Sequence, residues 1–381
     1  MNVIVVESPS KAKTINKYLG SQYKVIASMG HVRDLLAKEE AVDTNNNYEM
    51  KWQVSDKGKK VIKDIKSIAK DAKNLFLAPD PDREGEAISW HLEKLLRMDS
   101  KFDNLIIKRI TFNEVTKEAV IKSLEKPREL DQDLIDSYMA RRVLDFLVGF
   151  NLSPVLWRKL PGSKSAGRVQ SVALRLIVER EIEIEKFNPI EFWSISSNFN
   201  NQKGDKFLGK LTHFNEKKIE KLDIKSSNEA ENILSEIKKS SYFVSKIISK
   251  EVKRNPYAPF STSTLQQDSS IKLGFNANQT MRTAQRLYEG IEIDGEPTGL
   301  ITYMRTDSVA MASSAISELR NFIKENFGEK YLPNSTRIYK SKAKNAQEAH
   351  ECIRPTKISR KPIDIKSFLK EDEYNLYELI W

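Results

Sequence analysis

The stretch that decides the fold runs from Leu75 to Trp90 and reads LFLAPDPDREGEAISW. Its first four residues are apolar and predict a buried strand, and the pattern from Ala87 to Leu96 predicts a helix. The acidic run between them therefore falls in the turn at the carboxyl end of a strand. Open α/β sheets bind their ligands at that end.

The acidic run contains Asp80, Asp82 and Glu84. Carboxylates this close repel one another, and a divalent cation would neutralise them. Oxygen ligands of this kind suit magnesium, which keeps water ligands and accepts phosphate. On these residues alone, a solvated acidic turn that caps the next helix remains the commoner alternative.

The surrounding sequence predicts parallel βαβ packing. Asn2 to Val6 reads as a buried strand that ends at Glu7, and Ser10 to Leu19 reads as a helix ended by Gly20. Tyr23 to Ser28 and Leu105 to Ile110 are further expected strands, and Lys57 to Lys70 is a further expected helix. Glu7 and the acidic run thus follow strand ends that can converge on one site.

The later parts of the chain change in character. Helices are expected at Leu134 to Phe150 and Val169 to Phe187, followed by short strands, a helix at Asn228 to Lys239 and a strand at Tyr242 to Ser249. The final region is expected to hold helices at Thr262 to Lys272, Asn278 to Tyr288 and Ser313 to Asn326, and a short strand at Leu300 to Met304.

Composition narrows the class of protein. The chain has 381 residues and a formal net charge of +10, which favours a polyanionic partner such as nucleic acid, although a solvated basic surface remains an alternative. Cys352 is its one cysteine, so an internal disulfide and a zinc site of several thiolates are excluded. We find no signal peptide and no apolar run of membrane-spanning length, and we expect a cytoplasmic protein.

Tyr303 lies in the expected short strand, with Arg305 two residues on and therefore on the same side. A phenol can attack a phosphodiester, and a neighbouring cation would favour the phenolate and bind the phosphate charge. A tyrosine in an apolar strand more often packs in a core, so the spacing alone does not decide its role.

Four motifs carry a family resemblance. Glu7 with the Asp80-x-Asp82-x-Glu84 pattern resembles the Toprim fold of topoisomerases, primases and some nucleases. The opening from Glu7 to Ile15, ESPSKAKTI, resembles bacterial type IA DNA topoisomerases, and YMRTDS from Tyr303 resembles their active-site segment. SAGRVQ at residues 165–170 resembles a DNA-contacting segment of the same family.

The resemblance implies that Tyr303 attaches covalently to a DNA 5′ phosphate, with Arg305, Glu7 and Lys11 as further catalytic residues. It implies Mg²⁺ held by Glu7, Asp80, Asp82 and Glu84, with Mn²⁺ as a substitute, and no use of ATP or zinc. The DNA contacts that it implies are His31, Arg141, Arg142, Asp145, Phe150, Trp157, Ser165, Ala166, Gly167, Arg168, Val169, Gln170, Arg305 and His350.

The implied fold is multidomain α/β plus α, an incomplete type IA topoisomerase toroid. It comprises a Toprim (Rossmann-like) domain at 1–34 and 57–128, a helical DNA-groove domain at 129–190, a β-rich arch at 191–250 and 371–381, and a helical domain at 251–370 with the tyrosine. One departure is the link from Glu289 to Thr298, which looks longer than usual and for which we expect a surface effect.

The implied function is ATP-independent relaxation of negatively supercoiled DNA, by a monomer that binds single-stranded DNA. Two alternatives stay open. The chain ends where the family's β-rich arch should return, so it could be a catalytically impaired DNA-binding fragment. A Toprim nuclease would use the acidic residues without Tyr303.

Overall fold

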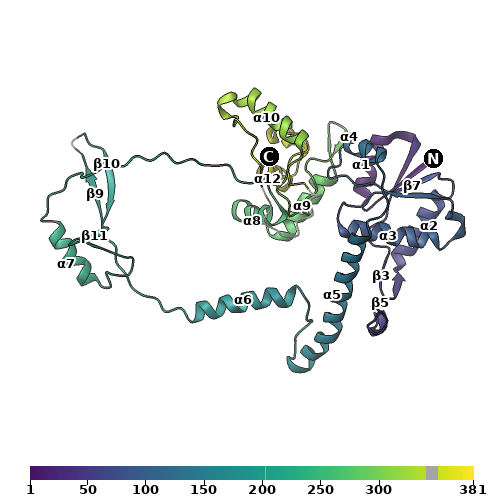
Figure 1. The fold of residues 1–381 in the computed structure, drawn as a ribbon, viewed down its shortest axis with the longest axis horizontal. Helices are drawn as coiled ribbons and strands as arrows, with labels where there is room; N and C mark the ends of the chain where they lie inside the picture. The colour runs from purple at the N-terminus through teal and green to yellow at the C-terminus, as the bar shows by residue number, and fades with distance from the viewer. Residues whose placement is uncertain (202, 340–350) are drawn as a thin grey trace. The chain divides into compact units, whose positions relative to one another are not determined.

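The computed structural model describes residues 1–201, 203–339 and 351–381 (Figure 1). The chain divides into two compact units. The first comprises residues 1–165 and 256–381, and the second comprises residues 166–255. Each is described by itself.

A four-stranded parallel sheet forms the base of the first unit (Figure 1). Its strand order is β2-β1-β7-β8, with β1 at Asn2–Val6, β2 at Tyr23–Ala27, β7 at Asn74–Leu77 and β8 at Ile106–Arg109. The four expected strands are confirmed, with ends that differ by at most one residue. Glu7 and the acidic run follow the adjacent strands β1 and β7, at the carboxyl edge of the sheet.

Helices cover both faces of this sheet. Alternate residues of β1 belong to two different cores: Ile4 and Val6 pack with α1 (Pro9–Leu19) and α4 (Lys117–Glu125), whereas Val3 and Val5 pack with α2 (Asp56–Ala69) and α3 (Arg83–Arg97). Each helix begins at a side chain that accepts a backbone N–H bond, as helix N-caps do. These caps are Ser8, Ser55, Asp82 and Thr116.

Two small antiparallel pairs lie between β2 and α2 in the sequence, where we predicted no strand. They pair β3 (Arg33–Leu35) with β6 (Trp52–Val54), and β4 (Val42–Asp43) with β5 (Glu49–Met50). Short 3-10 helices occur at Gly20–Gln22, Glu39–Ala41, Ser100–Phe102, Glu329–Tyr331 and Lys366–Phe368.

The long helix α5 (Gln132–Lys159) packs against α3. We expected it to end at Phe150, but it continues through Pro154 for another two turns. A proline inside a helix removes one backbone hydrogen bond, and its ring crowds the carbonyl of the residue four positions earlier. The extension carries Trp157 on the same helix as Arg141 and Arg142.

The remaining helices of the first unit are α8 (Thr262–Leu273), α9 (Ala277–Glu289), α10 (Ser313–Phe327), α11 (Pro362–Ile365) and α12 (Glu371–Ile380). The structure differs from our expectation at residues 371–381, which we assigned to the β-rich arch. They form α12, which packs on α8 and α9 and buries Leu376 and Tyr377 in the core. Arg286 of α9 fixes α12 further through ion pairs with Asp372 (2.7 Å) and Glu373 (2.6 Å).

The expected strand at 300–304 is also wrong. Within the described part of the chain, the segment makes an isolated antiparallel bridge, between Ile301 and Pro355. Its backbone N–H groups bond to three separate segments, with Leu300 donating to Leu287, Thr302 to Arg354 and Tyr303 to Asn113. Because these bonds form no continuous ladder, the segment is extended without belonging to a sheet.

The second unit contains α6 (Gln170–Glu185), two antiparallel pairs and α7 (Ser227–Ile237). The pairs are β9 (Ser196–Asn200) with β10 (Lys206–Lys210), and β11 (His213–Phe214) with β12 (Lys217–Lys218). Tyr242 to Ser249, an expected strand, has no regular secondary structure because it pairs with no strand of the described chain. Among the described residues, we find no helix long and apolar enough to cross a bilayer.

Candidate active site

Tyr303 lies beside the acidic turn. Its side chain is 2% exposed, and its hydroxyl donates a hydrogen bond of 2.7 Å to Asp82 Oδ2. The ring also packs edge-on against Tyr288 of α9, with 5.3 Å between centroids. The helical part of the unit thus presents the predicted nucleophile directly to the sheet edge that carries the carboxylates.

Three carboxylates gather at this edge. Burial, together with the negative charges of Asp80 and Asp82, raises the pKa of Glu7 to about 7, against the opposing effects of Lys11 and Arg305. Lys11 is fully buried and forms an ion pair with Asp80. The Lys11 ammonium also lies 4.9 Å from the centre of the Tyr288 ring. A buried lysine is tolerated here because a carboxylate and an aromatic face surround it.

Glu7, Asp80 and Asp82 are carboxylates that repel one another, and oxygen donors of this kind are ones whose repulsion a divalent cation would relieve. Glu84, the fourth predicted ligand, instead turns toward His31 (3.2 Å) and Arg141 (4.0 Å). In residues 1–201, 203–339 and 351–381 no three acidic, histidine or cysteine side chains converge as metal ligands. Lys11 and Tyr303 engage oxygens of Asp80 and Asp82 in this arrangement.

Arg305 lies on the same side as Tyr303, as we expected, with its Nη1 3.9 Å from Asp82 Oδ2. Burial raises the pKa of the Tyr303 phenol well above its usual value, and Asp80 and Asp82 raise it further, while Arg305 lowers it. The phenol is therefore protonated here, and Arg305 is the neighbouring cation that favours its ionisation.

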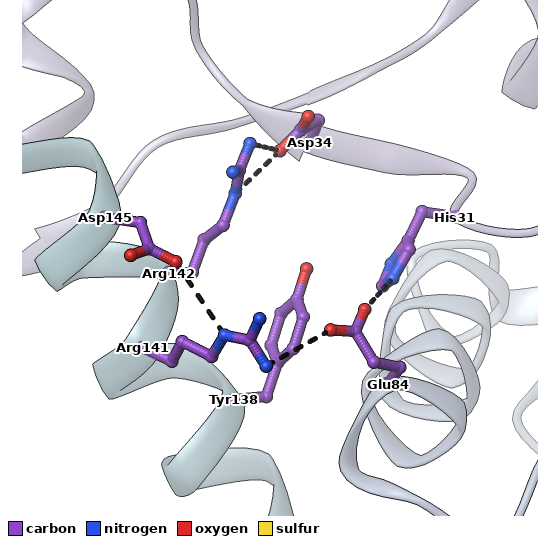
Figure 2. A pocket seen from close by; sticks show the side chains of 7 residues that line it. All are labelled: His31, Asp34, Glu84, Tyr138, Arg141, Arg142 and Asp145. Atoms are coloured by element: carbon purple, nitrogen blue, oxygen red, sulfur yellow. Dashed lines mark hydrogen bonds and ion pairs between the residues drawn. The ribbon is translucent and has the colours of Figure 1, made fainter. Parts of the chain in front are cut away.

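A cavity of about 260 Å³ lies beside the acidic turn, between α5 and the His31 loop (Figure 2). It is lined by His31, Asp34, Glu84, Tyr138, Arg141, Arg142 and Asp145. Arg141 lies 3.8 Å from Asp145, and Arg142 Nε donates to Asp34 Oδ1 at 3.1 Å. Four of the predicted DNA contacts, His31, Arg141, Arg142 and Asp145, thus surround one hollow.

Sequence reasoning missed two members of this cavity. The Tyr138 ring stacks on His31 with 5.5 Å between centroids, and Asp34 pairs with Arg142. Tyr138 precedes Arg141 by three residues, a spacing that puts both on one face of a helix. The helical period of the sequence therefore predicts that Tyr138 lies beside Arg141. Asp34 lies far from α5 in the sequence, so no local spacing relates it to Arg142.

Two predicted aromatic contacts lie further along α5. Phe150 is 43% exposed and stacks on Phe146 with 4.2 Å between centroids. Trp157 is 56% exposed, and its indole N–H donates to the Lys164 carbonyl at 2.7 Å. Both present ring surface to solvent, as base-stacking residues must.

The predicted DNA-contacting segment at residues 165–170 spans the boundary between the units. Ser165 ends one stretch of the first unit, and Ala166 to Gln170 open the second. The helix α6 begins at Gln170, and the Gly167 N–H donates to Ser171 Oγ at 3.2 Å. His350 lies outside the described residues.

The link from Glu289 to Thr298 forms a hairpin of β13 (Ile291–Ile293) and β14 (Glu296–Thr298). Two side chains of α1 hold it: Lys17 donates to the Gly295 carbonyl at 3.1 Å, and the Tyr18 hydroxyl donates to the Pro297 carbonyl at 2.7 Å. The link is therefore a structural contact between the helical part and α1, and more than a surface feature.

A second contact joins the same two parts. Arg354 lies 3.2 Å from Glu114 of the segment after β8, and 2.7 Å from Glu351. Arg354 and Glu114 are largely buried. With the Tyr303 N–H bond to the Asn113 carbonyl (2.7 Å), these contacts set the tyrosine segment against the sheet.

Two family models match the chain: residues 2–115 match the Toprim domain, and residues 129–381 match the DNA topoisomerase family. DNA topoisomerase 1 of Rickettsia felis is 54% identical over the whole chain, and that of Rickettsia bellii is 53% identical. The chain covers 49% and 48% of these relatives, respectively, and so spans about half their length.

A solved structure, the full-length topoisomerase I of Thermotoga maritima, matches all of the chain with a TM-score of 0.80 and 38% identity, and 59% of its own chain is covered. The Toprim match coincides with the sheet that carries the carboxylates. The longer match includes Tyr303 and the cavity-lining part of α5. The chain therefore belongs to the bacterial type IA DNA topoisomerase family.

Proposed function

We propose that this chain is the DNA-cleaving part of an ATP-independent topoisomerase that relaxes negatively supercoiled DNA. The observation that carries the proposal is the hydrogen bond of 2.7 Å between the Tyr303 hydroxyl and Asp82, beside Arg305 and the Lys11–Asp80 pair. Family membership supports the same reading. We assign Tyr303, Arg305, Glu7 and Lys11 the catalytic roles.

The proposed reaction is a transesterification. The Tyr303 oxygen attacks the phosphorus of one DNA strand and the bond from phosphorus to O3′ breaks. The phenol loses one proton and O3′ gains one as it leaves as a hydroxyl, so the number of protons is unchanged. Asp82 accepts the hydrogen bond of the phenol and is placed to take its proton. Arg305 stabilises the phenolate and the phosphate charge. The reverse attack by the 3′ hydroxyl restores the strand, and because one phosphodiester replaces another, no ATP is needed.

Glu7, Asp80 and Asp82 would hold Mg²⁺, or Mn²⁺ in its place, and the ion would supply charge stabilisation at the phosphate. Glu84 would join them only by leaving His31 and Arg141. In its present position it helps to orient those two cavity residues.

The cavity beside the turn is the proposed seat of single-stranded DNA. Arg141 and Arg142 supply positive charge, and Phe150 and Trp157 offer exposed rings, a combination that binds single strands through backbone charge and base stacking. We assign residues 165–170 and His350 to the same substrate. We propose that the protein acts as a monomer in the cytoplasm. The domain division predicted from the sequence stays a proposal, and residues 371–381 pack with α8 and α9 as α12.

Covalent capture tests the proposal. The chain is incubated with 5′- and 3′-labelled single-stranded DNA, with and without Mg²⁺, beside Tyr303→Phe, and is denatured before electrophoresis. We expect label on the protein only when the DNA fragment that carries the 5′ phosphate is labelled, and only with Tyr303. Salt-sensitive binding without an adduct would identify a DNA-binding fragment instead. Cleavage that persists in Tyr303→Phe would identify a nuclease.

A further inference from the structure

Arg109, the last residue of β8, is fully buried and lies outside the residues assigned to catalysis or binding. Its guanidinium donates to four backbone carbonyls. Nη1 bonds to Leu77 (3.0 Å), Pro79 (3.1 Å) and Ile110 (2.7 Å), and Nη2 bonds to Asp80 (2.7 Å). Three of these carbonyls belong to the stretch that leads from β7 into the acidic turn.

The third nitrogen of the Arg109 guanidinium, Nε, donates a hydrogen bond of 3.0 Å to the Glu86 carboxylate. Glu86 is fully buried on the first turn of α3, the helix that Asp82 caps. Arg109 therefore bonds to the acidic turn on both sides of Asp82. It bonds to backbone carbonyls before Asp82 and to the Glu86 carboxylate on the helix after it. A lysine cannot make these bonds together, because only the planar guanidinium presents five donors in a fixed fork.

Glu86 extends the network to α5. Its carboxylate accepts from Arg128 at 2.7 Å and 2.9 Å, and from the backbone N–H of Asp131 at 2.7 Å. Asp131 is the N-cap of α5, which carries Arg141 and Arg142. One buried carboxylate thus joins the acidic turn to the start of the helix that lines the cavity.

We propose that Arg109, held by Glu86, is a positioning residue that fixes the acidic turn in the geometry in which Asp80 and Asp82 bind a divalent cation. Outer partners of metal ligands typically contribute roughly 10- to 100-fold to metal affinity by orienting those ligands. Arg109 does so through the main chain of the turn, without touching the carboxylates. The proposal rests on the metal site assigned under the proposed function, but it does not depend on DNA cleavage.

Mn²⁺ binding provides the test, measured from the electron paramagnetic resonance signal of the free ion in the absence of DNA. The variants are Arg109→Lys and Glu86→Gln, with Asp82→Asn as a variant of a proposed ligand. The matched control is Arg97→Lys. Arg97 also donates to backbone carbonyls, those of Phe102, Asp103 and Leu105, but at the other end of the sheet.

We expect Arg109→Lys to weaken Mn²⁺ binding by roughly 10- to 100-fold, Glu86→Gln to weaken it in the same direction, and Arg97→Lys to leave it unchanged. Thermal unfolding establishes which variants fold, and Glu86→Gln, which preserves shape, carries the test if Arg109→Lys does not. Wild-type affinity in a folded Arg109→Lys or Glu86→Gln chain would overturn the proposal. Equal weakening by Arg97→Lys, or no Mn²⁺ binding by the wild type, would also overturn it.

The test of the positioning role and the test of the proposed DNA cleavage can fail independently of each other. The Mn²⁺ measurement contains no DNA, so its outcome does not depend on whether Tyr303 forms an adduct. An Arg109→Lys chain that binds Mn²⁺ weakly, in a protein that forms no adduct at all, would support the positioning role and contradict only the cleavage reaction.

Discussion

The Tyr303 hydroxyl donates to Asp82 although the two residues lie 221 positions apart in the chain. Two distant lengths of sequence, which pack together in one hydrophobic core, therefore build one reacting group. The bond keeps the phenol protonated, and it also gives the phenolic proton an acceptor once a phosphate is in place. The tyrosine, the carboxylate and the cation Arg305 are already assembled in the chain alone.

Arg305 is expected to control the cleavage rate. Arg305→Ala removes the one positive charge that lowers the pKa of Tyr303 among the contributions resolved for it, so adduct formation should slow by roughly 10²- to 10³-fold. Arg305→Lys should retain part of the rate, because it keeps the charge. Single-turnover adduct formation at saturating DNA measures both. An Arg305→Ala rate equal to that of the wild type would remove Arg305 from the reaction.

Gly85 has no room for a side chain. A Cβ there would lie 2.0 Å from the Asp80 carbonyl oxygen, so Gly85→Ala must displace the acidic turn or the start of α3. We expect it to lower the free energy of unfolding by about 1–3 kcal/mol. Urea denaturation measures the change.

Gly149→Ala is the matched control, because no atom beyond its own neighbourhood lies within 4 Å of that Cβ. Within α5 this alanine should stabilise the chain by about 0.5–1 kcal/mol. Equal effects of the two substitutions would show that the close approach at Gly85 is relieved without cost.

His91 should make stability depend on pH. Burial, together with the electrostatic effects of Arg33 and His31, lowers its pKa from 6.5 to about 2. The unfolded chain takes up the proton below pH 6.5 and the folded chain does not, so stability present above pH 6.5 is lost as the pH falls. This histidine contributes a slope of up to about 1.4 kcal/mol per pH unit between pH 6.5 and 2.

His91→Gln preserves an acceptor for the Arg33 N–H that bonds to the His91 ring. The free energy of unfolding of this variant should fall less steeply than that of the wild type between pH 6.5 and 4.5, although the variant is less stable overall. Chemical denaturation across that range compares the slopes. Parallel curves would show that His91 is protonated in the folded state.

Arg142 is expected to contact a DNA phosphate. Arg142→Ala should weaken binding to single-stranded DNA of any sequence, and should reduce the dependence of log affinity on log salt by about one phosphate contact, roughly 0.7 in slope. Fluorescence anisotropy at several salt concentrations measures the slope. Arg97→Ala, at the other end of the sheet, should leave the slope unchanged. An unchanged slope in Arg142→Ala would place this arginine outside the DNA path.

The sheet and its helices could be predicted from the sequence because their signals are local. Apolar strands, caps such as Ser8 and Asp82, and the helical period each lie within a few residues. The expected strand at 300–304 failed because its backbone bonds reach three distant segments, which no local pattern records.

Some site residues could likewise be placed from local sequence patterns, whereas others depend on distant contacts. Strand ends placed Glu7 and Asp80 together, but the direction of Glu84 depends on His31, which follows two residues of positive φ, Met29 (57°) and Gly30 (85°). The role of Tyr303 came from family resemblance. The structure adds its contact with Asp82. Arg109 carried a weak signal as a charged residue at the end of an apolar strand.

The β13–β14 hairpin and the Arg354–Glu114 pair both connect the helical part that carries Tyr303 to the part that contains the sheet. Any motion that lifts the tyrosine segment away from the sheet must break the hydrogen bonds from Lys17 and Tyr18 to the hairpin. It must also break the ion pair between Arg354 and Glu114 and the hydrogen bond between Tyr303 and Asp82. These contacts stabilise the arrangement in which Tyr303 lies against the sheet edge. Under the proposed function, they would favour the position in which the two ends of a cleaved strand stay close enough to be rejoined.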